Sequence, residues 1–282
     1  MEIKNVSVIG GGTMGNGIAH VFAMKGFDVN LVEMSEQLYT HSIDTISKNL
    51  DRQVNKATIT ENDKIKILKK INKVITIDNI PVDSDLIIEA IFENKEAKKS
   101  IFSKLDIIIK PDSIFASNTS SISITELAAT CRSDRFIGMH FMNPVPLMKL
   151  VEVIRGYSTS ESTFNTIREL SQQLDKVPVE VFDYPGFISN RILMPMINEA
   201  IFTLMEGVAS KNDIDTVMKL GMNHPMGPLT LADFIGLDVC LAIMDVLYNG
   251  YNDSKYRPCP LLKKMVAANK LGRKTGEGFY KY

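Results

Sequence analysis

A histidine and a glutamate with the chemistry of a proton-transfer pair stand on two consecutive β-rich runs. His140 lies near the end of the run 136–141, and Glu152 lies between two valines in the run 150–154. A carboxylate in a buried strand needs a hydrogen-bond donor, and an imidazole that transfers protons needs a group that orients it. A strand-end histidine alone is more often an ordinary hydrogen-bonded residue, but here each residue supplies what the other requires. The pair therefore predicts general acid and base chemistry.

Two further groups of polar residues could serve the same site. The segment Ser117-Asn118-Thr119-Ser120-Ser121 follows another β-rich run, at the edge of the sheet where open α/β folds bind their ligands. Serine-rich segments are also common as simple loops. Asn190 comes early in a helix-like segment, where it could equally be a helix-start or surface amide.

A glycine-rich segment near the start of the chain predicts a dinucleotide site. Gly10-Gly11-Gly12-Thr13-Met14-Gly15 fits the pattern G-x-G-x-x-G, directly after a β-rich run and at the start of a helix-like segment. Such glycines permit a tight turn and bring a pyrophosphate close to the amides at the positive end of the helix. Glu33 ends the second run, where a carboxylate would bind the adenosine ribose and repel a 2′-phosphate. The pattern favours NAD over NADP, although Ser35 could help to hold a phosphate and a plain glycine turn is the alternative.

The elements that must position these residues are short β-rich runs that alternate with helix-length segments. This alternation predicts a Rossmann-like, doubly wound α/β fold with a mostly parallel sheet. Residues 36–73 are too long for a simple crossover and are patterned as two helices around Thr60-Glu61-Asn62-Asp63, which predicts a projecting helical hairpin. The expected strands are 6–9, 27–32, 74–77, 86–91, 113–116, 136–141 and 150–154.

A domain boundary is expected at Asp183-Tyr184-Pro185-Gly186, where proline and glycine interrupt the pattern. We expect residues 1–183 to form a nucleotide-binding domain that carries the hairpin, and residues 187–282 to form an all-α domain for substrate binding and dimerisation. Apolar positions in 192–208 and 239–247 exceed what one layer of helices can bury, which predicts a homodimer and leaves a higher assembly of dimers open. Pro195 predicts a kink or a local break in its helix. Residues 271–282 are glycine-spaced and irregular.

Composition argues against several other classes of protein. Lysine and arginine number 32 against 33 aspartates and glutamates, so no general field attracts nucleic acid or an anionic membrane. Cys131, Cys240 and Cys259 have neither metal-ligand nor C-x-x-C spacing, so we expect no disulfide framework and no metal site. The sequence contains no run of eighteen apolar residues and begins without a secretory pattern, so we expect a cytoplasmic protein with no membrane partner.

Six ordered motifs closely resemble the short-chain 3-hydroxyacyl-CoA dehydrogenase family, and within it most of all the bacterial 3-hydroxybutyryl-CoA dehydrogenases. The resemblance covers essentially the whole chain. It implies an NAD-dependent enzyme that interconverts a (3S)-3-hydroxyacyl-CoA and the matching 3-oxoacyl-CoA. The motifs are Gly10-x-Gly12-x-x-Gly15, Ser117-Asn118-Thr119-Ser120-Ser121, His140-Phe141-Met142-Asn143-Pro144, Pro185-Gly186-Phe187-Ile188-Ser189-Asn190-Arg191, His224-Pro225-Met226-Gly227-Pro228 and Gly272-Arg273-Lys274-Thr275-Gly276-Glu277-Gly278-Phe279-Tyr280.

The same resemblance implies roles for individual residues. His140 would be the general base and acid with Glu152 as its partner, and Ser120 and Asn190 would hydrogen-bond the reacting oxygen. Lys98 would lie near both cofactor and substrate. The other implied cofactor contacts are Glu93, Asn143 and Lys274.

The resemblance also implies that Lys56 of the hairpin approaches the phosphates of CoA. Asn49 stands where the family has the serine that accompanies this contact, and Glu33 stands where many relatives have aspartate. The longer acid should still accept hydrogen bonds from a ribose.

Two other functions stay open on the sequence. A dehydrogenase of a free hydroxy acid would share the cofactor fold, but such relatives commonly use a lysine as base and need an arginine to bind the carboxylate. A protein that binds NAD without turnover, as a structural relative does in some eye lenses, belongs to a different class. Presence of every catalytic residue type at its expected position argues against the latter.

Overall fold

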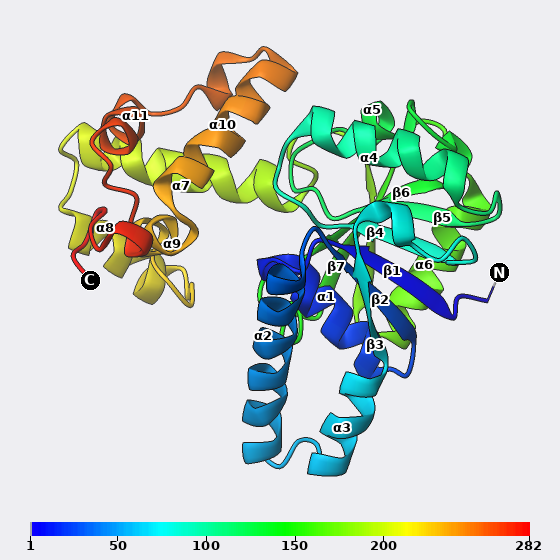
Figure 1. Ribbon diagram of the computed structural model, residues 1–282. Coiled ribbons are helices and arrows are strands. Elements are labelled where there is room, and N and C mark those ends of the chain that lie inside the picture. Colours follow the sequence, from blue (N-terminus) through cyan, green and yellow to red (C-terminus); the bar gives the residue numbers. More distant parts are fainter. Residues whose placement is uncertain (1) are drawn as a thin grey trace. The chain divides into compact units, whose positions relative to one another are not determined.

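The computed structural model describes residues 2–282, which divide into two compact units (Figure 1). The first unit ends at Asp183 and the second begins at Tyr184. Over residues 2–282, no helix combines the length and apolar character that a bilayer span requires. Within the same range, no group of three or more histidine, cysteine, aspartate or glutamate side chains could hold a metal ion.

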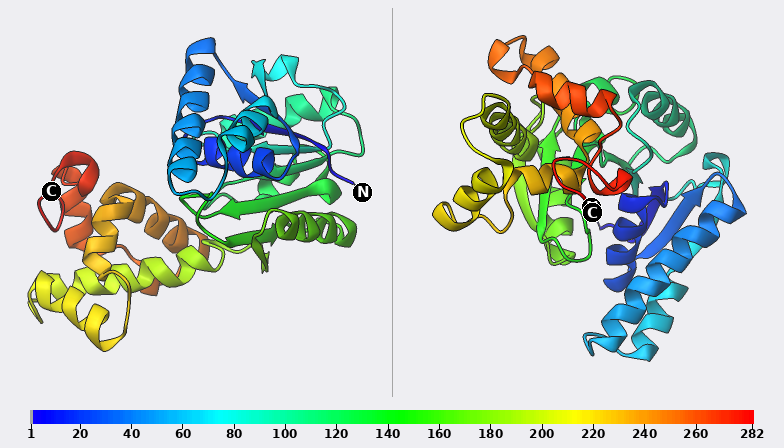
Figure 2. Two further views of the ribbon diagram at one scale, coloured as in Figure 1. Left: turned by 90° about the horizontal axis from the view of Figure 1, so that it is seen from below. Right: turned by 90° about the vertical axis from the view of Figure 1, so that its left-hand side faces the viewer.

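The first unit is built on an eight-stranded sheet in the order β3-β2-β1-β4-β5-β6-β7-β8. Neighbouring strands are parallel except for the antiparallel pair β6 and β7. Helices cover both faces (Figures 1 and 2), so the expected Rossmann-like fold is confirmed. The strands are β1 (Asn5–Ile9), β2 (Asp28–Glu33), β3 (Ile71–Ile75), β4 (Leu86–Glu89), β5 (Ile114–Ser117), β6 (Phe136–Phe141), β7 (Leu150–Arg155) and β8 (Val177–Phe182).

The two faces of this sheet bury different residues because side chains alternate along each strand. On one face, Val8 of β1 and Ile88 of β4 belong to a large apolar core with α1 and α6. On the other face, Phe102 of α4 packs against Phe115 and Phe136 with ring centroids 5.8 and 4.6 Å away. The helices of this unit are α1 (Thr13–Met24), α2 (Glu36–Asn55), α3 (Glu61–Lys69), α4 (Lys95–Ile108), α5 (Ile124–Ala128) and α6 (Glu161–Gln173).

The segment between β2 and β3 forms the predicted helical hairpin, α2 and α3, which extends beyond the sheet (Figure 1). A capping box starts α3: the Thr60 hydroxyl accepts from the amide of Asp63 at 3.1 Å, and the Asp63 carboxylate accepts from the amide of Thr60 at 3.0 Å. An ion pair between Lys64 and Asp51 joins the two helices. Leu50 is fully buried in the apolar core, so α2 is anchored to that core by packing.

Both edges of the sheet differ from the expected strands. The third strand is Ile71–Ile75 rather than 74–77, because on this edge strand Asn72 and Lys73 reach solvent and hide the apolar pattern. The strand Val177–Phe182 was not expected at all. Pro178 lies within it, and a proline that cannot donate to a ladder is tolerated only at an edge.

The second unit consists of helices and irregular segments. Its first helix runs through Pro195 without interruption, so the expected local break does not occur. The closing residues are irregular, as expected, and contain only the isolated bridges Gly272 to Glu277 and Glu277 to Lys281 as extended structure. The helices are α7 (Ser189–Met205), α8 (Lys211–Thr216), α9 (Pro228–Ile235), α10 (Leu237–Tyr251) and α11 (Pro260–Ala267), with a π-helical turn at Val217–Gly221.

Two carboxylates fix the closing segment of this unit. Asp233, which is 1% exposed, accepts hydrogen bonds from the amides of Phe279 at 2.9 Å and Tyr280 at 2.8 Å. Asp215 accepts from the Tyr280 hydroxyl at 3.0 Å. A Cβ atom on Gly278 would lie 2.0 Å from an Asp233 oxygen, so this position requires glycine. The glycine-spaced motif around Lys274 is therefore held by packing on a buried aspartate.

Candidate active site

His140 and Glu152 face each other across the antiparallel pair β6 and β7. They are register partners, and His140 Nδ1 lies 2.7 Å from Glu152 Oε2. Both side chains are buried, with 8% and 2% of their surfaces exposed. When Nδ1 donates to the carboxylate, the basic nitrogen of the imidazole is Nε2. The structure thus brings together the two residues that the sequence paired.

The strand alternation collects polar side chains on one face of the sheet, the face that packs against α4. Glu89 ends β4 beside Ser117 of β5, and Ser117 is the register partner of Gly138 in β6. His140 and Glu152 follow on β6 and β7. A row of polar groups therefore crosses the carboxyl ends of β4, β5 and β6, which is the edge where ligands of such sheets bind.

A buried ion pair between Glu89 and Lys98 was not foreseen from the sequence. Lys98 Nζ donates to Glu89 Oε1 at 2.7 Å, and both residues have 1% or less of their surfaces exposed. Glu89 also accepts from the Ser117 hydroxyl at 2.6 Å and from the amide of Ile91 at 2.7 Å. Burial raises the pKa of the Glu89 carboxyl, against the attraction of the Lys98 ammonium and these hydrogen bonds. The sequence signal was a carboxylate within an apolar run, the same signal that marked Glu152.

Glu93 organises the serine-rich loop. Its Oε1 atom accepts from the amides of Ser120 at 3.0 Å and Ser121 at 3.2 Å, and from the hydroxyl of Thr119. Its other oxygen lies 3.1 Å from Lys98 Nζ. Burial alone would raise the pKa of Glu93, but the Lys98 ammonium and the Thr119 hydroxyl bond lower it. The lysine thus bridges Glu93 to Glu89 and ties the loop to the sheet.

The serine-rich loop and the histidine strand are joined directly. The Asn118 side-chain oxygen accepts from the amide of Phe141 at 3.0 Å, next to His140. The amide of Asn118 in turn donates to the carbonyl of Glu89 at 2.8 Å. Ser120, His140 and Glu93 therefore belong to one connected network at this edge of the sheet.

The glycine segment forms the turn that a dinucleotide site requires. A Cβ atom on Gly15 would lie 1.7 Å from the carbonyl oxygen of Gly10, which itself has φ +86°. A Cβ atom on Gly11 would collide with Ser42, whose hydroxyl donates to the Glu33 carboxylate at 3.3 Å. Glu33 also accepts from the amide of Gly11 at 2.6 Å, so the carboxylate stands directly against the turn.

At Gly12, the need for glycine would come from a bound ligand and not from the protein. No protein atom lies within 4 Å of the place its Cβ would occupy, so the fold itself would accept a side chain there. Gly12 is also the N-cap of α1 and makes no side-chain cap, which leaves the positive end of the helix to a ligand phosphate. These residues fit a dinucleotide pyrophosphate with Glu33 beside it.

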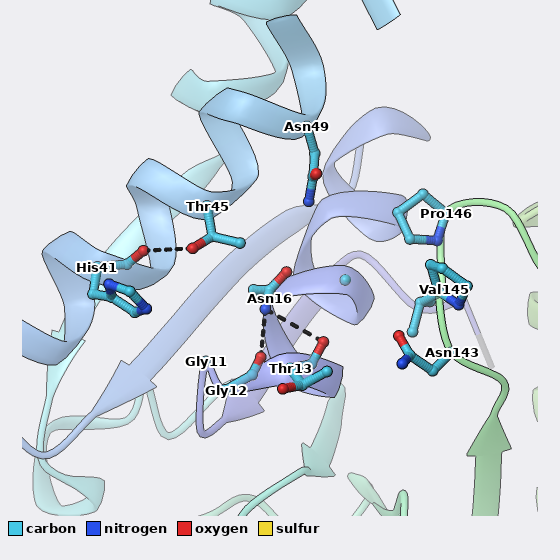
Figure 3. Close-up of a pocket in the computed structure, with 12 residues that line it drawn as sticks. Gly11, Gly12, Thr13, Asn16, His41, Thr45, Asn49, Asn143, Val145 and Pro146 are labelled. Carbon is cyan, nitrogen blue, oxygen red and sulfur yellow. Dashed lines mark hydrogen bonds between the residues drawn. The ribbon is translucent and has the colours of Figure 1, made fainter. Parts of the chain in front are cut away.

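A pocket of about 410 Å³ opens next to this turn (Figure 3). Asn143 and Asn49 line it from opposite sides, Asn49 from α2 and Asn143 from the loop after β6. Asn16 crosses its base and donates to the carbonyls of Gly12 and Thr13. Its other lining residues are Gly11, Gly17, His41, Thr45, Pro144, Val145 and Pro146.

The remaining predicted residues lie on other elements of the chain. Lys56 is the C-cap of α2, exposed at the far end of the hairpin from this pocket, whereas Asn49 lies within the helix. Asn190 is the second residue of α7 in the second unit and is 9% exposed. Lys274 lies in the closing segment of that unit and pairs with Asp238.

Two models of one family together match nearly the whole chain. The NAD binding domain of 3-hydroxyacyl-CoA dehydrogenase matches residues 5–184, and the C-terminal domain of the same enzyme matches residues 186–282. The chain belongs to the 3-hydroxyacyl-CoA dehydrogenase family. NAD is accordingly its cofactor, in agreement with the turn and carboxylate described above.

Several members of the family are closely similar to this chain. The 3-hydroxybutyryl-CoA dehydrogenase of Bradyrhizobium diazoefficiens is 57% identical over 281 residues, which cover 99% of this chain and 96% of the relative. The mitochondrial hydroxyacyl-coenzyme A dehydrogenase of Homo sapiens is 47% identical over 288 residues, covering 99% and 91%. The crystal structure of (S)-3-hydroxybutyryl-CoA dehydrogenase from Ralstonia eutropha has a TM-score of 0.97 at 51% identity and covers 100% and 99% of the two chains.

The comparisons favour the family that the motifs indicated over the two alternatives. A solved prephenate dehydrogenase from A. aeolicus, which is only 15% identical with a TM-score of 0.50, shares the fold alone. The close relatives named above are dehydrogenases of hydroxyacyl-CoA compounds. The family thus supports an enzyme acting on a thioester rather than on a free acid.

Proposed function

We propose that this protein interconverts (3S)-3-hydroxybutyryl-CoA and acetoacetyl-CoA by hydride transfer with NAD(H). The observation that carries the proposal is the buried pair of His140 Nδ1 and Glu152 Oε2, 2.7 Å apart on the sheet edge that also carries the glycine turn. The names of the Bradyrhizobium and Ralstonia relatives support the four-carbon substrate. NAD, when bound, supplies the acceptor for the hydride that leaves C3 of the substrate.

In the oxidation direction, His140 takes the proton of the 3-hydroxyl group through Nε2. The negative charge of Glu152 stabilises the imidazolium that forms, because burial leaves little water to screen the attraction. Ser120 and Asn190 donate hydrogen bonds to the substrate oxygen as it gains charge. In reduction, the imidazolium returns the proton to the same oxygen.

We assign the cofactor contacts to the glycine turn, Glu33 and four further residues. The main chain of Gly10, Gly12, Thr13, Met14 and Gly15 would hold the pyrophosphate, and Glu33 would accept from the adenosine ribose, which favours NADH over NADPH. Glu93 and Lys98, beside the Ser120 loop, would stand near the nicotinamide end. The remaining proposed contacts are Asn143 and Lys274.

We assign the CoA end of the substrate to the helical hairpin. Asn49 would offer an amide from the pocket wall, and Lys56 would offer a positive charge to the phosphates. Lys98 is 1% exposed and its ammonium is paired with Glu89 and Glu93, so it would act on the acyl end through the Ser120 loop that it holds.

We also propose that the protein is a cytoplasmic homodimer formed through the second unit, with a higher assembly of dimers as an extension. Ile192 and Val208 are 68% and 71% exposed in the single chain, and Val239 of α10 is 41% exposed. Apolar side chains in such positions favour burial against a second copy. The three cysteines are free thiols, which suits a reducing compartment.

The test is the oxidation of NADH, followed at 340 nm, with acetoacetyl-CoA as the substrate. The proposal expects saturable turnover that falls when the acyl chain is lengthened, whereas free acetoacetate should give none. Turnover of the free acid would favour the hydroxy-acid alternative. Tight NADH binding with no turnover of any thioester would favour a non-catalytic protein.

A further inference from the structure

Lys176 is a buried cation outside the residues discussed so far. It directly precedes β8, is 7% exposed, and donates from Nζ to the carbonyl oxygens of Val145 at 2.5 Å and Met148 at 2.7 Å. Both acceptors belong to the loop between β6 and β7. Burial lowers the pKa of Lys176, against the attraction of Asp175. Burying an ammonium costs desolvation free energy. The hydrogen bonds to two main-chain carbonyls of one loop offset part of this cost and fix the lysine against that loop.

The loop that Lys176 holds connects the two strands of the acid–base pair. It starts just after Phe141, the neighbour of His140, and ends at β7, which carries Glu152. Four of its residues, 143–146, form one wall of the pocket beside the glycine turn (Figure 3). The lysine therefore bonds to the main chain of the wall that a bound cofactor or substrate would touch.

The same wall is packed against α1, the helix that begins at the glycine turn. A Cβ atom on Gly17 would lie only 2.9 Å from the Cβ atom of Val145, so glycine is required for this close approach. Lys25 at the C-cap of α1 forms an ion pair with Asp175, the residue before Lys176. The turn before β8 is thus tied to α1 at one point and to the loop at another.

We propose that Lys176 is a positioning residue for ligand binding, which fixes the wall 143–146 at the distance from α1 that the cofactor site requires. The expected effect of Lys176 on turnover rests on the proposed function. Its expected effect on the affinity for NADH rests only on the binding of the cofactor. Without the ammonium, two carbonyls of the loop lose their donor and the wall can move away from α1. A displacement of about 1 Å is enough to reduce the rate on the order of a hundredfold.

The first experiment compares wild type with Lys176→Ala in NADH binding, followed by the fluorescence of bound NADH, and in steady-state kinetics with acetoacetyl-CoA. We expect a Kd and a KM for NADH raised about tenfold or more, with a smaller loss in kcat. The matched control is Asp175→Asn, which removes the charge of the neighbouring ion pair, keeps a side-chain oxygen that can accept from Lys25, and leaves both loop carbonyls bonded. Asparagine also suits the φ of +57° at this position, so the control should bind NADH like wild type.

Chemical rescue then separates positioning from general stability. Propylammonium has the same chain and charge as the part of lysine that the alanine variant lacks. We expect it to restore NADH affinity and turnover to Lys176→Ala in a saturable way. Propan-1-ol at the same concentration should restore little, and neither compound should change wild type.

Three outcomes would overturn the inference. One is a folded Lys176→Ala protein with wild-type Kd and KM for NADH. Another is a loss of binding that only follows the fraction of unfolded protein and is not rescued by propylammonium. If the alanine variant does not fold, Lys176→Met is used in its place because methionine keeps most of the side-chain volume. The third outcome is that neither variant folds, which would show that the lysine serves stability rather than positioning. A wild-type enzyme inactive on acetoacetyl-CoA would refute the proposed function and leave the NADH-binding test intact.

Discussion

Replacing Glu152 by glutamine tests the division of work between the two residues of the acid–base pair. The substitution keeps the shape of the side chain, which is 2% exposed, and removes its charge. With the atoms 2.7 Å apart, the charge centres of imidazolium and carboxylate lie about 4 Å apart. At an effective dielectric constant of about 20, their attraction is about 4 kcal/mol.

This attraction exists only when the imidazole has taken a proton, so its loss falls on the transition state. Each 1.4 kcal/mol is about a tenfold change in rate, and glutamine still orients the ring by a hydrogen bond that offsets part of the loss. We therefore expect Glu152→Gln to lower kcat by roughly two orders of magnitude. The KM for NAD should stay near that of wild type because the imidazole contributes little to cofactor binding.

The assay is a double-mutant cycle with His140→Gln in the oxidation of (3S)-3-hydroxybutyryl-CoA by NAD, the direction in which His140 takes the proton. His140→Gln should abolish most turnover and leave the Kd for NADH nearly unchanged. If the two residues act as one unit, the double variant should lose far less than the product of the separate losses. Strictly multiplicative losses, or near-normal turnover in His140→Gln, would refute the assignment. Circular dichroism of each variant checks that the fold is retained.

Three other predictions concern the cofactor, the stability and the assembly. Replacing Glu33 by alanine removes a charged acceptor for the ribose and should reduce kcat/KM for NADH by roughly tenfold or more. The preference for NADH over NADPH should therefore become smaller. An unchanged ratio of kcat/KM for NADH to kcat/KM for NADPH would contradict the role of Glu33. Burial lowers the pKa of His20 to about 4, so the folded state resists protonation and stability should fall by about 3 kcal/mol as the pH drops from 6.5 towards 4. Urea unfolding at pH 7.5 and 4.5 checks this, and His20→Gln should lose less stability over the same range. Light scattering at micromolar concentration should give twice the chain mass, and a monomer would rule out the proposed dimer.

The acid–base pair could be predicted from sequence because each residue lacked something that the other supplies. Glu152 needed a donor in an apolar strand, and His140 needed a group to orient it. Glu89 gives the same signal within the run 86–91, but its partner Lys98 lies on the following helix and carries no mark in the sequence. Sequence patterns locate a buried charge more readily than they identify its partner.

The centre of the sheet was predicted better than its edges, also for a physical reason. Strands β1, β4 and β6 lie inside the sheet, are largely buried on both faces, and give mostly apolar runs. The edge strand β3 exposes Asn72 and Lys73, and β8 contains Pro178, so neither gives such a run. The role of Lys176 was invisible for a related reason, because its acceptors are carbonyls that any residue possesses.

The two faces of the sheet favour a functional rather than a stabilising role for the buried charges. The face against α1 and α6 is filled with apolar residues such as Val8 and Ile88, so this chain can pack its sheet without charges. The opposite face buries Glu89 at the end of β4 and Glu152 within β7, each with a cationic or protonatable partner. A well-packed apolar pair in such a place is often as stable as the ion pair or more stable. The charges are therefore better explained by the reaction at this edge, where protons and hydride must move beside fixed carboxylates.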